Sequence, residues 1–228
     1  MFVKICGITN EHDALLAVAL GADALGFVMA PSRRRVSPQA VSDIVKRLPN
    51  EVITVGVFVN EDPDLVARIV AETGLTGAQL HGSEGKTTCT SLRPRVRFLV
   101  KAVSGDAMSL GPYMDYPVDA ILVDSRQPGS GRAFDWSLLD ASHSRRPIIL
   151  AGGLNPYNVA AGIRDVRPWG VDVSTGVEAA PGEKDPVALR SFIQNARAAF
   201  AEVEAADLAE DGLAAHPHGE AYNWEENL

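Results

Sequence analysis

The chain of 228 residues repeats one pattern eight times: a short apolar run, followed in most cases by a stretch with helical periodicity. The runs start roughly 20 to 30 residues apart, the length of a strand plus a helix that returns along the sheet to the next parallel strand. Few architectures accommodate such a recurrence. The expected strands are residues 2–6, 23–28, 52–58, 76–80, 96–101, 118–123, 147–150 and 169–174.

Capping residues and prolines between the runs mark where helices are expected to begin, because a side-chain oxygen satisfies the first backbone N–H groups and proline is tolerated in the first turn. The expected starts are at Asn10, at Pro38 and at the dipeptides Asp62-Pro63, Asn155-Pro156 and Asp185-Pro186. Residues 104–115 and 134–141 have weaker patterns, so their units do not require a helix.

Strands this uniformly apolar are typical of a parallel sheet that is covered on both faces. Closed on itself, the sheet would be a (β/α)8 TIM barrel; left open, it would be doubly wound. We favour the barrel because eight is the closing number of strands, and eight units fill the chain with little room for a second domain. The sequence therefore predicts an α/β fold with one barrel domain, residues 1–202.

The net charge of −8 is concentrated at the end of the chain. From Glu202 onward there are eight acidic residues and no Lys or Arg, which leaves 21 acidic and 21 basic residues before it. Neither part has the basic face that nucleic-acid binding requires. Residues 203–228 are expected to form an acidic extension that is flexible or loosely docked, although Tyr222 and Trp224 leave open that its end packs on the barrel or a partner.

The start of the chain resembles neither an export signal nor a spanning helix, since Lys4 and Asp23 interrupt its apolar stretches. We therefore expect a cytoplasmic protein with no membrane contact. In that compartment Cys6 and Cys89 are expected to stay reduced. Cys89 lies in a helical stretch and is interpreted as a packing residue.

The carboxyl ends of barrel strands carry the active site in this architecture. Cys6 ends the first expected strand and precedes Gly7, and Asp124 ends the sixth and precedes a glycine-rich loop. A buried cysteine often only fills space, and a strand-end aspartate often only caps a loop. Both structural interpretations stay open, but the shared rim makes Cys6 and Asp124 candidates for acid–base chemistry.

Two glycine loops suit a phosphate group. "AGGLNP", with Gly152 and Gly153, follows the seventh run, and "STGVE", with Gly176, follows the eighth. Loops after strands 7 and 8 form the recurrent phosphate site of these barrels, where backbone N–H groups converge on the anion. "APSRRRVSP" adds arginines suited to a carboxylate, and "QLHG" adds Gln79 and His81, the latter also readable as structural.

Sequence motifs for catalytic metals and nucleotide cofactors are missing: there is no HExxH or CxxC spacing, and no strand is followed by a Rossmann or Walker sequence. We expect no metal and no cofactor, and a phosphorylated small molecule as the partner. Oligomeric state is left open between monomer and homodimer.

With these residues placed, the chain resembles the phosphoribosylanthranilate isomerase family of tryptophan biosynthesis over about residues 2–200. The motifs, in the family's order, are "VKICGIT", "GADALGFVMAPSRRRVSP", "VGVFVN", "QLHG", "ILVDS", "GSGRAFDW", "LAGGLNPYNV" and "VDVSTGVEAAPGEKD". The resemblance implies an Amadori rearrangement of N-(5-phosphoribosyl)anthranilate to 1-(2-carboxyphenylamino)-1-deoxyribulose 5-phosphate.

The resemblance also implies roles. Cys6 would be the general base, Asp124 the general acid, and Arg34 the partner of the anthranilate carboxylate. The remaining implied substrate-binding residues are Gly152, Gly153, Ser174, Thr175 and Gly176 in the phosphate loops, and Gln79, His81 and Asp172 in the pocket lining. A thiol acts as a base only as thiolate, and Lys4, on the same strand face, is one candidate for favouring that form.

The sequence departs from the family in two places. Thr175 replaces a usual serine and keeps the hydroxyl, and the loop at residues 125–131 is shorter than in many members. The alternatives are another phosphosugar barrel, such as a ribulose-phosphate epimerase or the histidine-pathway isomerase, and a non-catalytic barrel that only binds a phosphorylated ligand. An epimerase would need metal-binding residues, and the histidine-pathway enzyme would have Asp in place of Cys6.

Overall fold

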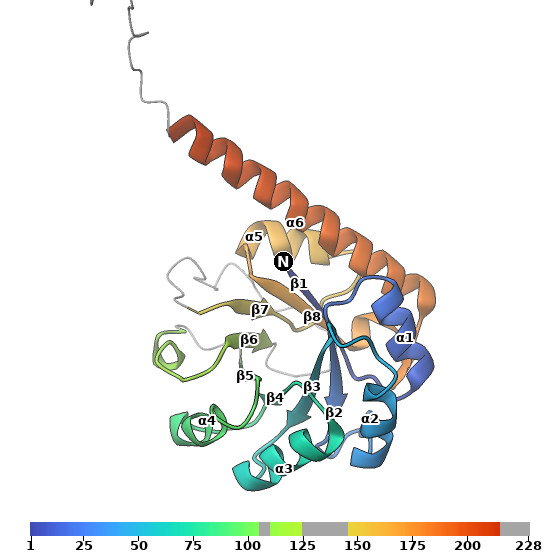
Figure 1. Cartoon of the computed structure of the whole chain (residues 1–228). Coiled ribbons are helices and arrows are strands. Elements are labelled where there is room, and N and C mark those ends of the chain that lie inside the picture. The colour runs from blue at the N-terminus through green and yellow to red at the C-terminus, as the bar shows by residue number, and fades with distance from the viewer. Residues whose placement is uncertain (105–109, 125–145, 215–228) are drawn as a thin grey trace, which may run out of the picture.

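Eight parallel strands close into a barrel in the order of the sequence, β1 to β8, and β8 pairs with β1 (Figure 1). The computed structural model describes residues 1–104, 110–124 and 146–214, with 210–214 by their backbone only. The strands are β1 (Phe2–Cys6), β2 (Ala24–Val28), β3 (Ile53–Phe58), β4 (Gly77–Leu80), β5 (Phe98–Ser104), β6 (Ala120–Asp124), β7 (Ile148–Leu150) and β8 (Gly170–Val173). All eight predicted strands are confirmed, as is the (β/α)8 barrel.

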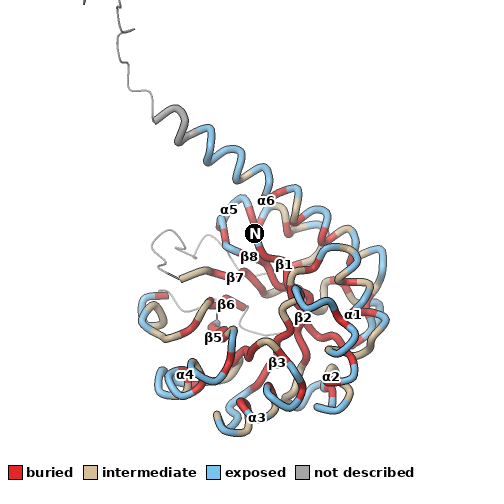
Figure 2. Tube along the Cα trace, viewed as in Figure 1, coloured by how far each residue is buried: buried red, intermediate tan, exposed pale blue. Residues whose placement is uncertain are grey.

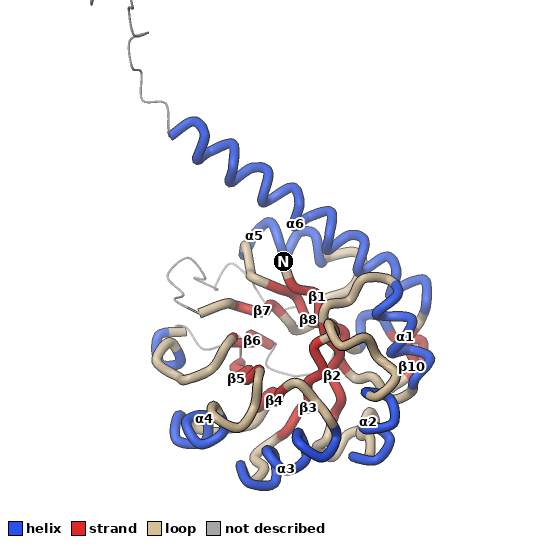
Figure 3. The backbone as a smooth tube through the Cα atoms, viewed as in Figure 1, coloured by secondary structure: helices blue, strands red, loops and turns tan. Residues whose placement is uncertain are grey.

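Helices surround the strands as an outer ring (Figure 3). They are α1 (Glu11–Ala19), α2 (Pro38–Val45), α3 (Pro63–Thr73), α4 (Lys86–Leu92), α5 (Val159–Val166) and α6 (Pro186–Ala214), with 3-10 turns η1 (Gly111–Tyr113) and η3 (Thr175–Val177). The starts of α1, α2, α3 and α6 are confirmed. The Asn10 side chain accepts from the N–H of Asp13 at 2.9 Å, and Asp185 accepts from that of Ala188 at 2.7 Å.

The predicted helix start at Asn155-Pro156 is wrong, because α5 begins three residues later, at Val159. The Asn155 side chain instead closes a tight turn by accepting from the N–H of Tyr157 at 2.8 Å. Asn158, which precedes the helix, donates to the carbonyl oxygen of Gly153 at 2.9 Å. The asparagines therefore tie the glycine loop to the start of α5.

The two weak units remain only partly visible. Within residues 104–115 the structure has the short turn η1, while residues 105–109 and the expected helix at 134–141 lie outside the described residues. The loop at 125–131 lies outside them as well.

The expected end of regular structure near residue 202 is not met, since α6 continues to Ala214 (Figure 1). The segment after Phe200 is rich in Ala, Glu and Leu, which are strong helix formers. Val203 still packs against the core, and Glu202 and Asp207 form ion pairs with Arg164 and Arg167 of the α5 side. Residues 215–228, with Tyr222 and Trp224, lie outside the described part of the chain.

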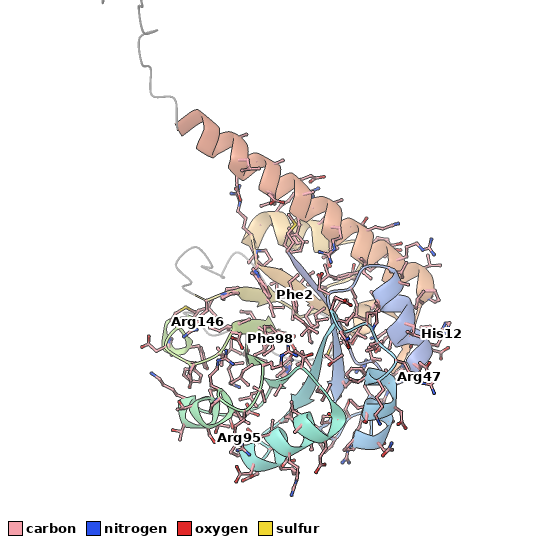
Figure 4. All side chains as sticks on the ribbon, in the orientation of Figure 1. Phe2, His12, Arg47, Arg95, Phe98 and Arg146 are labelled. Atoms are coloured by element: carbon pink, nitrogen blue, oxygen red, sulfur yellow. The ribbon has the colours of Figure 1, made fainter. Side chains whose placement is uncertain are left out.

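Side chains inside the barrel change from apolar to polar along the strands. Successive residues of a strand point to opposite faces, so Phe2, Lys4 and Cys6 share one side of β1. Phe2 packs in an inner apolar cluster that Phe98 of β5 borders, and Figure 4 labels both within the ring of strands. The strands are almost wholly buried, whereas the helices expose their outer faces (Figure 2). This arrangement leaves the polar residues at the carboxyl ends of the strands.

None of the described helices is both long and apolar enough to cross a membrane. Cys89 is fully buried in α4 and packs in the outer core, which confirms its interpretation as a packing residue.

Candidate active site

Cys6 occupies a space that a glycine keeps open. It ends β1 and pairs with Gly26 of β2. A Cβ atom added to Gly26 would lie 2.7 Å from the sulfur of Cys6 and 3.1 Å from Nζ of Lys4. The distance to the sulfur is shorter than real Cβ contacts and the distance to Nζ is tighter than most of them, so the missing side chain at Gly26 leaves room for the thiol and the ammonium inside the barrel.

Lys4 and Asp172 form a buried ion pair below the thiol. Nζ of Lys4 lies 2.7 Å from Oδ1 of Asp172, and the lysine side chain is fully buried. Burial by itself lowers the pKa of Lys4, but the neighbouring Asp172 and Cys6 outweigh this effect, so the pKa lies above its usual value. Lys4 is therefore a lasting positive charge next to the sulfur.

The net effect of the surroundings is nevertheless to raise the pKa of Cys6. Burial is the largest cause, Lys4 and Lys184 act in the opposite direction, and Asp172 adds to the rise. The candidate role of Lys4 is right in direction, since its charge favours the thiolate, but that charge does not overcome burial. The thiol form predominates at neutral pH.

Asp124 lies at the end of β6 in contact with a short polar chain. Nε2 of His81 is 3.2 Å from Oδ2 of Asp124, and the side-chain nitrogen of Gln79 is 2.9 Å from Nδ1 of His81. If Gln79 donates to Nδ1, then Nε2 carries the proton and faces the carboxylate. Gln79 Oε1 is buried with no hydrogen-bond partner in the part of the chain that the structure describes.

The two glycine loops meet and enclose a small cavity. Gly152 and Gly153 have φ angles of 81° and 72°, a region that favours glycine. A Cβ atom on Gly176 would lie 1.9 Å from the carbonyl oxygen of Leu154, so only glycine lets the loops approach this closely. The cavity has a volume of about 50 Å³. Its lining includes the predicted residues Gly152, Gly153, Ser174, Thr175, Gly176, Asp172 and Asp124.

A larger cavity of about 400 Å³ lies on the other side of Asp124. His81, Ser104, Tyr113 and Tyr116 contribute to its lining. Asp124 borders both cavities, one of a size for a small anion and one with room for a larger organic group.

Arg34 lies beside the phosphate loop but is held by a carboxylate of the chain itself. Its Nε and Nη2 donate to the two oxygens of Glu178 at 2.7 and 2.6 Å, and Nη2 also donates to the Thr175 hydroxyl at 3.3 Å. The hydrogen bonds to Glu178 raise the pKa of Arg34 further. Arg34, which is predicted to bind the substrate carboxylate, is therefore already held in one orientation by its two parallel hydrogen bonds to Glu178.

Sequence reasoning missed two residues of this region, Glu178 and Lys184. Lys184 is fully buried and its Nζ lies 3.0 Å from Oε1 of Glu178. Glu178 ends "STGVE", which is interpreted only through Gly176 as an anion loop, and Lys184 lies in "VDVSTGVEAAPGEKD", which is quoted only for the family resemblance. The available signal was a glutamate and a lysine six residues apart in the segment that follows the eighth strand. We call Lys184, Glu178 and Arg34 the Lys184 cluster.

The structure brings most of the predicted residues to one mouth of the barrel. In ring order, β7 and β8, which carry the phosphate loops, stand between Cys6 on β1 and Asp124 on β6. Within the described ranges, no group of three or more potential metal ligands occurs. Fold and site together define a class: (β/α)8 barrel enzymes that hold a phosphorylated small molecule between the loops after strands 7 and 8, with acid–base groups beside it.

Comparison with known proteins narrows this class to one family. The profile of N-(5'phosphoribosyl)anthranilate (PRA) isomerase matches residues 3–195. The N-(5'-phosphoribosyl)anthranilate isomerase of Desulforudis audaxviator is 51% identical over 202 residues, which are 87% of this chain and 98% of that protein. The Thermotoga maritima isomerase is 45% identical over 201 residues, 86% of this chain and 98% of the relative. The chain belongs to the PRA isomerase family, whose members are isomerases of tryptophan biosynthesis.

Solved structures agree with this assignment. The crystal structure of the Thermotoga maritima enzyme superposes with a TM-score of 0.81 at 44% identity, covering 87% of this chain and 99% of that one. A PRA isomerase in complex with reduced 1-(o-carboxyphenylamino)-1-deoxyribulose 5-phosphate has a TM-score of 0.77 at 42% identity, with the same coverage. The epimerase and histidine-pathway alternatives are thereby set aside.

Proposed function

We propose that the chain catalyses the Amadori rearrangement of N-(5-phosphoribosyl)anthranilate with Asp124 as general acid and Cys6 as general base. The observation that carries the assignment is their placement on either side of the phosphate loops, on β6 and β1, with Asp124 lining the anion-sized cavity. A sugar phosphate bound there would lie between a carboxyl and a thiol.

The reaction needs the two groups in turn. Asp124 gives its proton to the furanose ring oxygen, and the C1–O bond breaks while the anthranilate nitrogen forms an iminium with C1. The thiolate of Cys6 then removes the proton from C2, and the electrons of that bond form the enolamine. Tautomerisation of the enolamine yields the ketone. Positioned proton transfers of this kind contribute about 10²- to 10⁴-fold each.

Gln79 and His81 form a chain that can hydrogen-bond to Asp124 both when its carboxyl is protonated and when it is ionised. With Nε2–H of His81 directed at Asp124, the imidazole stabilises the carboxylate left after proton transfer. With the Gln79 amide turned over, its oxygen accepts from Nδ1–H, and Nε2 accepts from the protonated carboxyl. The 3.2 and 2.9 Å separations fit either arrangement, which supports a role for this chain in proton delivery.

The two ends of the substrate would be held by different loops. Gly152, Gly153 and the segment Ser174–Gly176 would bind the phosphate through backbone N–H groups and hydroxyls. Arg34 would bind the anthranilate carboxylate from its place beside Thr175. Holding both ends fixes the sugar between acid and base, which by itself can supply several kcal/mol of the barrier.

The surroundings of Cys6 predict how the ionisation of its thiol depends on pH. Because burial raises the pKa of the thiol and the base must be deprotonated, the thiolate fraction of Cys6 is expected to rise with pH across the neutral range and beyond it. The alkylation rate of Cys6 should rise over the same interval.

The finer partner and location assignments are also proposals. We propose a cytoplasmic enzyme that acts on one small phosphorylated substrate without a metal or cofactor, does not bind nucleic acid or membranes, and uses residues 1–202 as its barrel domain. A monomer or a homodimer is expected, and the Thermotoga maritima relative is described as dimeric. Light scattering on the purified chain distinguishes the two states.

The test is a fluorescence assay with freshly prepared phosphoribosylanthranilate, whose emission decreases as it reacts. Cys6→Ser and Asp124→Asn should each abolish nearly all turnover, while Cys89→Ser, in the outer core, should retain it. Retained activity in Asp124→Asn would contradict the assignment of the acid.

A further inference from the structure

Lys184 makes three directed contacts from a fully buried position. It lies in the short strand β10 (Glu183–Lys184), which pairs with β9 (Glu178–Ala180). Its Nζ donates to the carbonyl oxygen of Cys6 at 2.7 Å, to that of Ser174 at 3.2 Å and to Oε1 of Glu178 at 3.0 Å. Three acceptors around one nitrogen match the three N–H donors of an ammonium group.

The partners of Lys184 belong to three functional parts of the site. Cys6 is the proposed base, Ser174 is the first residue of the second phosphate loop, and Glu178 orients Arg34. The backbone of Lys184 is fixed independently, since its N–H donates to Oδ2 of Asp13 at 2.9 Å. One side chain therefore joins the ends of β1 and β8 to the residue that would hold the substrate carboxylate.

We propose that Lys184 is a positioning residue of the isomerisation, which holds the base, the phosphate loop and Arg34 in register and keeps a positive charge beside the reacting thiol. The inference rests on the proposed roles of Cys6 and Arg34. Lys184 itself does not touch the reacting atoms.

The charges around the thiol give Lys184 a distinct part. In the described part of the chain, the charged groups that interact with Cys6 include Lys4 from β1, Asp172 from β8, Lys184 from β10, and Arg34 from the loop after β2. Lys4 and Asp172 are paired and together neutral. The Lys184 cluster has two cations and one carboxylate, so it carries one net positive charge at neutral pH. Burial lowers the pKa of Lys184 and the nearby Glu178 opposes this effect. That excess charge favours a nearby thiolate or a substrate carboxylate.

Lys101 provides a matched control for the structural effect of losing a buried lysine. Its Nζ donates to the carbonyl oxygens of Leu80 and Gly82 at 3.3 and 2.7 Å and to Oε2 of Glu84 at 2.8 Å. We call Lys101 and Glu84 the Lys101 cluster. It has the same chemistry as the Lys184 cluster, but it contacts neither Cys6 nor Arg34.

The experiment compares Lys184→Met, Lys101→Met and the unsubstituted chain in iodoacetamide alkylation across a pH series. Cys6 and Cys89 are quantified separately on peptides by mass spectrometry. Loss of one nearby charge should move the alkylation midpoint of Cys6 upward by about one pH unit in Lys184→Met. Lys101→Met should leave this midpoint unchanged. At a fixed neutral pH, kcat/KM should be lower in Lys184→Met than in the unsubstituted chain, because a smaller fraction of Cys6 is thiolate.

A second variant keeps the inference testable if Lys184→Met does not fold. Glu178→Gln preserves shape and removes the negative charge of the cluster, so the Cys6 midpoint should move downward, a direction that general loosening does not produce. An unchanged midpoint in both variants, or an equal shift in Lys101→Met, would overturn the inference. Because alkylation needs no substrate, these outcomes are separate from the Cys6→Ser assay, whose failure would overturn the proposed function instead.

Discussion

The Lys184 and Lys101 clusters use the same three contacts, an ammonium between two backbone carbonyls and one glutamate, on different sides of the barrel mouth. Lys101 joins parts of a single loop, residues 80–84. Lys184 joins the ends of two strands, and its glutamate also holds Arg34. The two ion pairs have similar geometry, with N–O distances of 3.0 Å for Lys184 and 2.8 Å for Lys101 and buried side chains in both. The two lysines differ in what their partners contact. The partners of Lys184 include the backbone of Cys6 and the glutamate that holds Arg34, whereas the partners of Lys101 contact neither residue.

The largest expected effect on stability is in Lys101→Met. The substitution leaves Glu84 with the N–H groups of Asn60 and Gly82 as its remaining partners, and breaking a buried pair typically costs about 3–5 kcal/mol. Lys184→Met should cost less, because Arg34 still neutralises Glu178. Urea unfolding of both variants measures the difference, and equal losses would break the comparison.

Gly26→Ala should lower the activity of the enzyme by displacing the thiol of Cys6. The added methyl group would meet the sulfur and Nζ of Lys4, and a displacement of about 1 Å at a reacting group can lower kcat/KM by about 100-fold. Gly85→Ala is the matched control near the Lys101 cluster, since a Cβ there meets nothing within 4 Å. Steady-state kinetics on both variants tests this prediction. A normal kcat/KM in Gly26→Ala would show that the surrounding atoms make room for the methyl group without displacing the thiol.

Both clusters should lose part of their stability in acid. Burial alone would raise the pKa of Glu84 and of Glu178, but their hydrogen bonds to Lys101 and to Arg34 outweigh it, so both values lie below 4.5. A lowered carboxyl pKa contributes stability above the unfolded value that is lost as pH falls through the folded value. Unfolding free energy should therefore decline below about pH 4.5. Glu84→Gln should flatten that decline, and an unchanged slope by denaturant titration would argue against the pair's contribution.

The smallest expected effect on the free energy of unfolding comes from an exposed ion pair. Arg167 pairs with Asp207 between the end of α5 and the extension of α6, and both side chains are about half exposed. Such pairs contribute about 0.2–1 kcal/mol. Arg167→Ala should lower the unfolding free energy by no more than about 1 kcal/mol, and a larger loss would indicate that the extension of α6 is part of the folding core.

Much of the barrel could be predicted because its signals are local. An apolar run with helical punctuation on either side identifies a strand without knowledge of its partners, and eight such runs leave few arrangements. The misplaced start of α5 shows the limit of this reasoning. Asn155 has the correct residue type for a cap, but the competing turn depends on Asn158 and the carbonyl of Gly153, which become neighbours only in the folded loop.

The amino-acid sequence by itself determined the barrel, the strand-end positions of Cys6 and Asp124, and the glycine loops, since strand order and side-chain alternation follow from periodicity. Only the tertiary structure decided which partners the charged side chains have. Lys4 proved to be bound to Asp172, Arg34 to Glu178, and Lys184 to the carbonyl of Cys6 across 178 positions of sequence. Electrostatic free energies depend on distance and burial, and neither is encoded in the local pattern of a strand or helix.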